Sequence, residues 1–149
     1  MRFDHRVSVD APPERVWPLV MDIPQAAACI PGAHDVRALD DGRYQGTVRV
    51  QVGPVTVSVQ GTMALKEQDA TARRAVMELE GADRRVGGGV RGTMTLELGE
   101  PSPGRTELRV GADITFIGRL AELGQHLVRR KAEALLQEFA RNLAARAQG

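Results

Sequence analysis

Histidine and cysteine, the residue types that most often bind metals or act as nucleophiles, are few in this chain. The three histidines are His5, His34 and His126, and the single cysteine is Cys29. None of them forms a His-x-x-x-His or Cys-x-x-Cys pair, the spacings that bring two ligands to one metal ion. The sequence therefore predicts no metal site, and it predicts histidines that lie at the surface or form hydrogen bonds.

Other groups with reactive chemistry have simpler structural interpretations. Cys29 has no base near it in sequence, and a free cysteine is most often buried as a small apolar side chain. Asp83 is expected to be a turn residue. Gly87-Gly88-Gly89 lacks the Lys-Ser/Thr end of a phosphate-binding loop, so it predicts a bulge or a bent strand entry. We expect no catalytic residues, but the Tyr44 hydroxyl could hydrogen bond a ligand.

The composition excludes several classes of function. The 149 residues carry 20 Lys and Arg against 19 Asp and Glu, and this net charge of +1 is not that of a nucleic-acid-binding protein. Hydrophobic residues make up 42 % of the chain and aromatic residues 3 %, so aliphatic side chains must form the core. The length predicts a single domain over residues 1–149. Without an apolar signal segment or a membrane-spanning stretch, we expect a cytoplasmic protein.

Alternation of apolar and polar residues predicts strands over most of the chain. A first strand over residues 3–9 is followed by two short helices, one after Pro12-Pro13 and one over residues 25–30. Six further strands are expected between residues 33 and 116. The alternation is cleanest over residues 44–65, which predicts an antiparallel sheet with one apolar and one polar face.

The C-terminal stretch changes to a helical period. Apolar residues recur at three- and four-residue steps from Arg119 onward, which predicts one amphipathic helix of up to about 28 residues. We expect Gly124 to mark close backbone packing or space for a ligand. The region carries six basic and three acidic residues, including Arg129-Arg130-Lys131. The predicted fold is α+β, with a curved antiparallel sheet of about seven strands wrapped around this helix.

Five short segments resemble the carbon monoxide dehydrogenase G-subunit family of the START-like (SRPBCC) superfamily. In chain order they are Ala11-Pro12-Pro13-Glu14-Arg15-Val16-Trp17, Cys29-Ile30-Pro31-Gly32-Ala33, Tyr44-Gln45-Gly46, Val52-Gly53-Pro54 and Gly118-Arg119-Leu120-Ala121-Glu122-Leu123-Gly124. The resemblance implies a helix-grip fold with an apolar cavity between sheet and terminal helix. It also implies a non-enzymatic accessory protein that binds a quinone or another lipid and supports a molybdenum hydroxylase of the carbon monoxide dehydrogenase type. Peripheral contact with the inner face of the membrane is then expected through the basic C-terminal helix.

The expected cavity is walled by the inward faces of the strands, the Cys29 segment and the start of the terminal helix. Its predicted lining comprises Trp17, Cys29, Ile30, Pro31, Tyr44, Val48, Val50, Val57, Val59, Met77, Leu79, Met94, Leu96, Ile114, Phe116, Leu120, Leu123, Gly124 and Leu127. Two alternatives remain open. A START-like cyclase or hydrolase would place an acid or base in the pocket, from Tyr44, His5 or Asp113. A docking adaptor without a ligand would have an interior filled to normal packing density.

Overall fold

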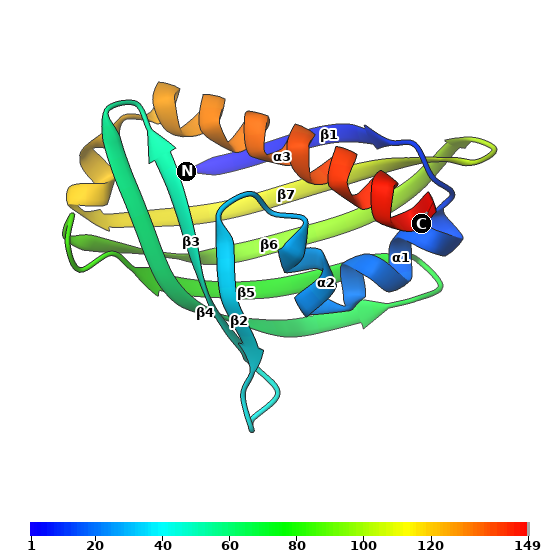
Figure 1. The fold of residues 1–149 in the computed structure, drawn as a ribbon, viewed down its shortest axis with the longest axis horizontal. Coiled ribbons are helices and arrows are strands. Elements are labelled where there is room, and N and C mark those ends of the chain that lie inside the picture. Colours follow the sequence, from blue (N-terminus) through cyan, green and yellow to red (C-terminus); the bar gives the residue numbers. More distant parts are fainter. Residues whose placement is uncertain (149) are drawn as a thin grey trace.

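In the computed structural model, which describes residues 1–148, a long curved sheet is crossed by a C-terminal helix (Figure 1). An N-terminal strand precedes two short helices, which are followed by six strands, a 3₁₀-helix and the terminal helix. In chain order these elements are β1 (Arg2–Val9), α1 (Pro13–Met21), α2 (Ile23–Ala28), β2 (Ala33–Ala38), β3 (Tyr44–Val52), β4 (Val55–Asp69), β5 (Arg74–Ala82), β6 (Gly88–Ser102), β7 (Arg105–Gly118), η1 (Arg119–Leu123) and α3 (Gln125–Gln148).

The seven strands form one antiparallel sheet in the order β1-β7-β6-β5-β4-β3-β2. Strands β2 to β7 are each next to their neighbour in sequence, whereas β1 pairs with β7 at the far edge. Since β1 and β2 occupy opposite edges, α1 and α2 carry the chain from one to the other, and α1 contacts β6 and β7. The predicted fold class, including the two short helices after the first strand, is confirmed.

The strand register places apolar side chains in rows on the inner face of the sheet. Tyr44 of β3 pairs with Met63 of β4, and Met63 pairs with Leu79 of β5. In a neighbouring row, Met77 pairs with Met94. Directly paired residues of antiparallel strands point to the same face. The predicted alternation therefore produces one continuous apolar surface that faces the interior.

A bend in β4 is marked by a line of glycines across three strands. Gly46, Gly61 and Gly81 pair with one another across β3, β4 and β5. A Cβ at Gly61 would collide with the backbone carbonyl oxygen of Glu80, and a Cβ at Gly81 would lie 2.6 Å from Val59 Cγ1. Only glycine fits where two backbones approach so closely. The bend carries β2, β3 and the first half of β4 across the other strands (Figure 1).

The two short helices meet at a proline turn. We expected Asp22-Ile23-Pro24 to end the first helix and the second to begin at Gln25, but α2 begins at Ile23. The reason is that proline is tolerated in the first turn of a helix, where its missing N–H would have no partner. Asp22 caps this turn, because its Oδ1 accepts a hydrogen bond from the Gln25 N–H at 3.3 Å.

The C-terminal helix is shorter than predicted. The chain forms η1 over Arg119–Leu123, and α3 begins only at Gln125. Gly124 separates the two with a φ of +90°, which an α-helix cannot contain. Apart from its chain neighbours, no atom lies within 4 Å of the position of a Cβ at Gly124. Of the two alternatives predicted for Gly124, close packing is therefore excluded and space for a ligand stays a prediction. No helix within residues 1–148 is long and apolar enough to cross a bilayer.

Two apolar clusters form the interior. The main cluster joins β1, α1, β7 and the second half of α3, and it contains the buried Val16, Leu108 and Leu143. The second cluster is smaller, lies next to η1, and contains the buried Val57 and Leu120. Most of the packing of α3 is against β1 and α1. The backbone of α3 thus lies nearest β1 and α1, while side chains of its second half share the main cluster with Met77 and Leu96 of the central strands.

The turn between β5 and β6 is built on the buried carboxylate of Asp83. It accepts backbone hydrogen bonds from Ser58 at 2.7 Å, Arg85 at 2.9 Å and Val86 at 3.0 Å. The pKa of Asp83 is lowered, chiefly by the Val86 and Ser58 hydrogen bonds. Asp83 is thus the turn residue that the sequence predicts, and it also ties the turn to β4. A bent entry into β6 follows at residues 87–89, where the first two glycines have positive φ.

Adding a Cβ at the bend in β4 should destabilise the fold. We expect Gly61→Ala to lower the free energy of unfolding by about 1–3 kcal/mol, because overpacking forces the backbone to shift. The matched control is Gly99→Ala in β6, where a Cβ meets only the flexible guanidinium of Arg109. We expect the control to change stability by no more than about 0.5 kcal/mol. Urea unfolding measures both, and equal stability of the two variants would contradict the role of Gly61.

Replacing Asp83 by asparagine should weaken the β5–β6 turn. We expect Asp83→Asn to lower the free energy of unfolding by about 2 kcal/mol at neutral pH. The NH₂ group of asparagine would replace one accepting oxygen, and a buried backbone N–H would then have no acceptor. The pKa of Asp83 is lower in the folded than in the unfolded protein. Its contribution is therefore complete above the unfolded pKa and is lost as the pH falls through the folded pKa.

The stability difference between wild type and Asp83→Asn should accordingly shrink below about pH 4. Urea unfolding across a pH series measures this difference. A difference that stays constant from neutral pH down to about pH 2 would mean that the charge of Asp83 does not stabilise the turn.

Candidate functional site

The side chains predicted to line a cavity are divided among three places. In or against the main cluster lie Trp17, Cys29, Met77, Met94 and Leu96. In or against the second cluster lie Val50, Val57, Val59, Phe116, Leu120 and Leu123. Neither cluster includes the half-buried Ile30, Pro31, Tyr44, Val48, Leu79 and Ile114, or the exposed Gly124 and Leu127. The structure thus brings most of these residues to one interior but leaves part of it outside the packed clusters.

One row of the inner face is incompletely packed. Tyr44, Leu79 and Ile114 come from β3, β5 and β7, and all three are half-buried. Register places them in a single row through Met63 and Gly92. A well-packed core would surround such side chains fully with neighbours. These three side chains are therefore inner-face residues that neither apolar cluster includes.

A pocket of about 190 Å³ opens at one end of this row, between β7, η1 and the start of α3. The Met1 ammonium marks the end of the row, because it donates a hydrogen bond to the Ile114 carbonyl oxygen at 2.6 Å. The pocket is lined by Met1, Phe116, Leu120, Ala121, Gly124, Gln125 and Val128. Its side chains are apolar except for the amide of Gln125, but polar atoms form the larger part of its accessible surface, to which the backbone and the N-terminal residue Met1 also contribute.

The sequence predicts Phe116, Leu120 and Gly124 as lining residues but misses the other four. Val128 could have been predicted as a lining residue, because it lies in the apolar stripe of the C-terminal region. Ala121 and Gln125 line the pocket because the helix breaks between them, and the apolar spacing does not reveal that break. Met1 reaches the pocket through the pairing of β1 with β7, which no local pattern indicates.

One wall of the pocket is the short segment η1. It lies between two glycines with positive φ, +67° at Gly118 and +90° at Gly124. These conformations let the chain leave β7, make one turn and restart as α3. Leu120 of η1 is only 3 % exposed and anchors the segment in the second cluster, whereas Ala121 is exposed.

Leu127, expected to wall the cavity, is not among the lining residues and is 39 % exposed. Because α3 starts at Gln125 instead of continuing from Arg119, Leu127 is directed toward the β3–β4 turn. Its Cδ1 lies 3.1 Å from the position that a Cβ would take at Gly53. Val128, the next residue, lines the pocket instead.

Tyr44 and His5 both face the interior, but neither lines the pocket. Tyr44 is half-buried, and within residues 1–148 no hydrogen bond joins its hydroxyl to another group. His5 of β1 lies with its ring centroid 6.3 Å from that of Phe3, and its Nε2 atom is buried without a partner among these residues. Asp113, the third candidate acid or base, is exposed. These groups do not form an acid–base pair at the pocket.

The thiol of Cys29 is 1 % exposed and lies in the main cluster. Burial raises its pKa, while the nearby Arg146 guanidinium acts in the opposite direction. The Cys29 carbonyl oxygen accepts a hydrogen bond from Asn142 Nδ2 at 2.9 Å, which ties the end of α2 to α3. A buried thiol with a raised pKa is a poor nucleophile, in agreement with the predicted structural role.

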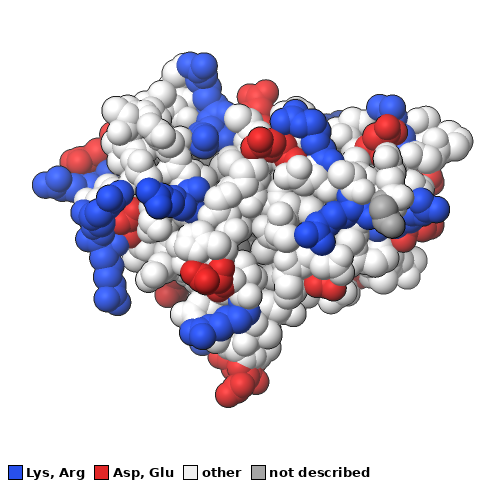
Figure 2. Space-filling view, in the orientation of Figure 1, with Lys and Arg blue, Asp and Glu red and all other residues white. Residues whose placement is uncertain are grey.

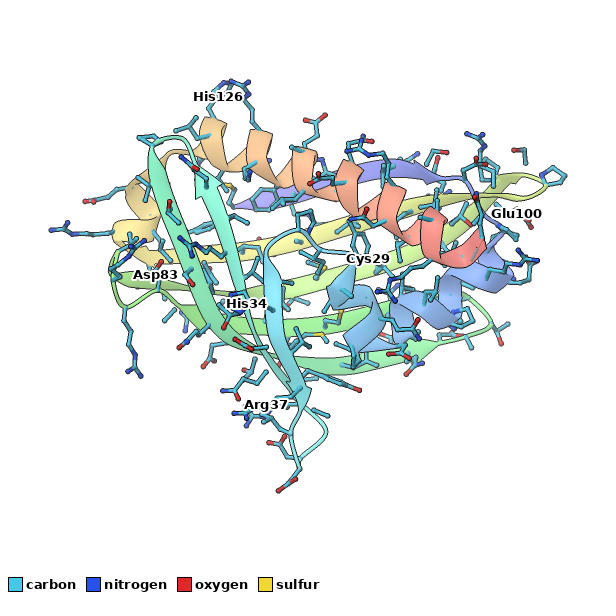
Figure 3. All side chains as sticks on the ribbon, viewed as in Figure 1. Cys29, His34, Arg37, Asp83, Glu100 and His126 are labelled. Carbon is cyan, nitrogen blue, oxygen red and sulfur yellow. The ribbon has the colours of Figure 1, made fainter. Side chains whose placement is uncertain are left out.

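The remaining histidines lie far from one another. His34 of β2 has its Nδ1 2.9 Å from Asp35 Oδ2, and His126 is exposed at the start of α3. Figure 3 shows Cys29, His34 and His126 on different elements. In the part of the chain that the structure describes, no three His, Cys, Asp or Glu side chains come close enough to hold a metal ion.

The outer face of the sheet has a larger but polar depression of about 430 Å³. Its lining includes Arg43, Lys66, Glu78, Glu80 and Arg91, and Lys66 Nζ lies 3.5 Å from Glu78 Oε2. An apolar ligand placed there would have to remove water from charged groups of both signs, which is unfavourable. The pocket at η1 is therefore the candidate site.

Solved structures with this fold come from several bacteria. A conserved protein from Geobacillus kaustophilus has a TM-score of 0.87 at 16 % identity, over 99 % of this chain and 95 % of that chain. A START superfamily protein from Mycobacterium smegmatis has a TM-score of 0.64 at 18 % identity, over 99 % and 97 %. The Zhui aromatase/cyclase from Streptomyces sp. R1128 has a TM-score of 0.65 at 18 % identity, over 99 % and 93 %. At such identities these likenesses establish the START-like helix-grip fold alone.

Comparison with curated proteins yields no match. A family model, however, gives a more specific match than the fold does. The model of CoxG, the G subunit of carbon monoxide dehydrogenase, matches residues 6–148, a range that includes all five segments that resemble this family in sequence. This protein therefore belongs to the CoxG family of carbon monoxide dehydrogenase subunits.

Proposed function

We propose that this protein binds an apolar ligand, a quinone or another lipid, and acts as a non-catalytic accessory to a molybdenum hydroxylase of the carbon monoxide dehydrogenase type. The observation that carries the proposal is the pocket at η1, whose lining side chains are apolar except for that of Gln125. Membership of the CoxG family supports a partner enzyme of this type. The binding role and the accessory role fit a small protein with one apolar pocket.

The volume of the pocket limits how much of a ligand it can hold. Pockets that enclose a whole drug-sized ligand measure about 300–1,000 Å³, and a cavity of about 150 Å³ can hold benzene. At about 190 Å³, the pocket suits one ring-sized group. The rest of a larger ligand would lie along the incompletely packed row from Ile114 to Tyr44, whose hydroxyl could donate a hydrogen bond to a ligand carbonyl.

The chemistry of the lining favours binding over catalysis. None of the lining side chains is ionisable. The N-terminal ammonium of Met1 is ionisable, but it donates a hydrogen bond to the Ile114 carbonyl oxygen. One protein of the same fold is an aromatase/cyclase, so an enzymatic function is the alternative to binding. For that alternative, His5 or Tyr44 would have to act on a ligand from outside the pocket. A ligand-free adaptor is disfavoured by the room that the pocket and the Tyr44 row retain.

We place the protein in the cytoplasm, in peripheral contact with the inner face of the membrane. The expected contact was the basic run Arg129-Arg130-Lys131. Arg129, however, is engaged within the protein: its guanidinium carbon lies 5.3 Å from the centroid of the Phe3 ring, and its Nη1 donates a hydrogen bond to the Arg2 carbonyl oxygen at 2.7 Å. These contacts hold α3 against β1, so a membrane contact needs other cations as well.

Native mass spectrometry before and after organic extraction tests whether the protein carries a ligand. We expect a non-covalent added mass that extraction removes, because apolar ligands leave a pocket for an apolar solvent. The extracted protein should then bind 2,3-dimethyl-1,4-naphthoquinone, a quinone ring with no position open to addition of a thiol. Protein that is ligand-free from several expression hosts and fails to bind this quinone would contradict the proposal.

Filling the pocket should abolish binding without unfolding the protein. Ala121 is exposed and lines the pocket, so Ala121→Phe adds a ring at the site. We expect the affinity for 2,3-dimethyl-1,4-naphthoquinone to fall at least about tenfold, because the quinone loses its buried apolar contacts. Ala134→Phe, at an exposed alanine of α3 outside the pocket, is the matched control and should bind like wild type. Calorimetric titration measures both, and unchanged affinity in Ala121→Phe would place the ligand elsewhere.

A further inference from the structure

Strand β1 lies at the edge of the sheet, with β7 on one side and no strand on the other (Figure 1). The Met1 nitrogen donates a hydrogen bond to the Ile114 carbonyl oxygen at 2.6 Å, and the Ile114 N–H donates one to the Met1 carbonyl oxygen at 2.9 Å. Hydrogen-bonded and non-hydrogen-bonded pairs alternate along an antiparallel ladder. The backbone N–H and C=O groups of the even-numbered residues of β1 therefore point away from β7, toward the free edge.

Two side chains of α3 reach this free edge, one at each end. Arg129 Nη1 donates a hydrogen bond to the Arg2 carbonyl oxygen at 2.7 Å, and Gln148 Nε2 donates one to the Asp10 carbonyl oxygen at 2.7 Å. Between these contacts, the edge-facing backbone groups of residues 4, 6 and 8 have no hydrogen-bond partner within residues 1–148. All eight residues of β1 pair with β7 without a bulge. A regular edge strand with free backbone groups is a template for another strand.

The side chains of the even-numbered residues form a self-complementary charge pattern. They are Arg2, Asp4, Arg6 and Ser8, and all four are exposed. When two β1 strands pair antiparallel through their free edges, Asp4 of each copy can lie opposite Arg6 of the other. Opposite charges in directly opposed positions stabilise a strand pair, and like charges destabilise it.

The same pattern disfavours the neighbouring registers. A shift by two residues in one direction would place Asp4 opposite Asp4, and a shift in the other direction would place Arg6 opposite Arg6. A shift by one residue would place the free backbone groups opposite groups that already bond β7. The charges and the backbone therefore favour a single register.

The inner face of β1 gives an independent indication. In this register, His5 lies opposite His5 of the second copy, on the two-fold axis. His5 Nε2 is buried without a hydrogen-bond partner in the part of the chain that the structure describes. Buried polar atoms nearly always have a partner. The Cα atoms of a non-hydrogen-bonded pair lie about 4.5 Å apart, so one imidazole could donate a hydrogen bond to the other.

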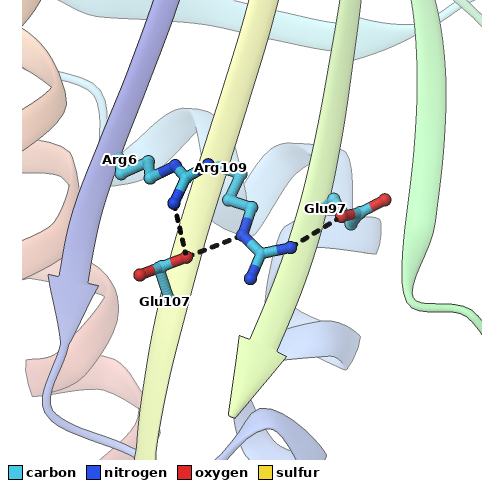
Figure 4. Close-up of polar contacts among 4 residues, drawn as sticks. All are labelled: Arg6, Glu97, Glu107 and Arg109. Atoms are coloured by element: carbon cyan, nitrogen blue, oxygen red, sulfur yellow. Dashed lines mark hydrogen bonds and ion pairs between the residues drawn. The ribbon is translucent and has the colours of Figure 1, made fainter. Parts of the chain in front are cut away.

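The remaining surface charges do not oppose the association of two copies. The net charge is only +1, and Figure 2 shows basic and acidic side chains interspersed over one face of the molecule. Long-range repulsion between copies is therefore small. On the outer face of the sheet, Arg6 Nη1 lies 4.0 Å from Glu107 Oε1, which lies 2.6 Å from Arg109 Nε (Figure 4). Pairing with Asp4 of the second copy would continue this row of alternating charges.

We propose that the protein forms a homodimer in which two β1 strands pair antiparallel about a two-fold axis at His5. The two seven-stranded sheets then become one continuous sheet. Asp4 of each copy exchanges main-chain hydrogen bonds with Arg6 of the other. A second copy fits this edge better than a foreign strand, because the complementary charges lie within β1 itself. No residue from 2 to 9 lines the pocket at η1, so the dimer does not depend on ligand binding.

Sedimentation equilibrium of charge variants tests the dimer. In Arg6→Glu, both symmetry-related Asp4–Arg6 pairs become like-charged, and the dissociation constant of the dimer should rise at least about tenfold. Asp4→Arg/Arg6→Asp restores opposite charges and should bring the constant back to within about threefold of wild type. The matched control is Arg91→Glu, the same charge reversal at an exposed arginine of β6, which should stay within about twofold of wild type.

Two results of this measurement would overturn the proposal. One is wild-type protein that stays monomeric up to about 1 mM. The other is an equal loss of affinity in Arg6→Glu and Arg91→Glu.

Engineered cysteines test the register. His5→Cys places the two thiols on the axis, with their Cα atoms about 4.5 Å apart, within the range of a disulfide. The control is Ser8→Cys on the same edge, whose Cα atoms would lie about 20 Å apart. Under mild oxidation, non-reducing electrophoresis should show a cross-linked dimer for His5→Cys and none for Ser8→Cys, while the native Cys29 is too buried to react. Cross-linking of Ser8→Cys instead, or of neither variant, would overturn the proposed pairing.

Discussion

The bend in β4 determines the shape of the interior. At this point Gly46, Gly61 and Gly81 face one another across three strands, and a side chain at Gly61 would collide with the backbone of β5. Because these residues lack a Cβ, β2 and β3 can swing across the sheet and enclose Tyr44 and the other inward-facing residues. The same glycines contribute no side-chain volume to the inner face. The constraint that closes the sheet is therefore a close approach of β3, β4 and β5 beside the row that contains Tyr44.

The division of the core into two clusters explains why the pocket lies at η1. The second half of α3 is held by its packing in the main cluster, where Leu143 is fully buried. The first half follows the break at Gly124. It is held by Val128, by the contact of Leu127 with the β3–β4 turn and by the contacts of Arg129 with Phe3 and Arg2. Beyond its chain neighbours, no atom lies within 4 Å of a Cβ position at Gly124, so room remains at the start of the helix. η1 partly fills this room with Leu120, and the remainder is the pocket.

The strand pattern was predictable from sequence because every second residue of each strand faces the same interior. The alternation over residues 44–65 reflects that geometry directly, and the five family-like segments added the connection between strands and helix. The break at Gly124 was not predictable from the apolar spacing, since residues 120, 123 and 127 fit a helical period whether or not the backbone is continuous. The pocket was equally hidden, because a packed core and a cavity require the same apolar alternation. Met1 enters the site only through the pairing of β1 with β7.

The distribution of packing also determines the end at which an apolar molecule could enter. Entry through the main cluster would expose fully buried side chains such as Leu108 and Leu143, at a cost of about 1.5–3 kcal/mol for each. At η1 the obstacle is a single short segment between two glycines, anchored chiefly by Leu120. The net charge of +1 conceals a second asymmetry. Ion pairs neutralise arginines on the outer face of the sheet, whereas Arg84 of the β5–β6 turn and Arg119 of η1 have no acidic partner within the described residues. The least resistant entry and this positive charge therefore lie at the same end of the sheet.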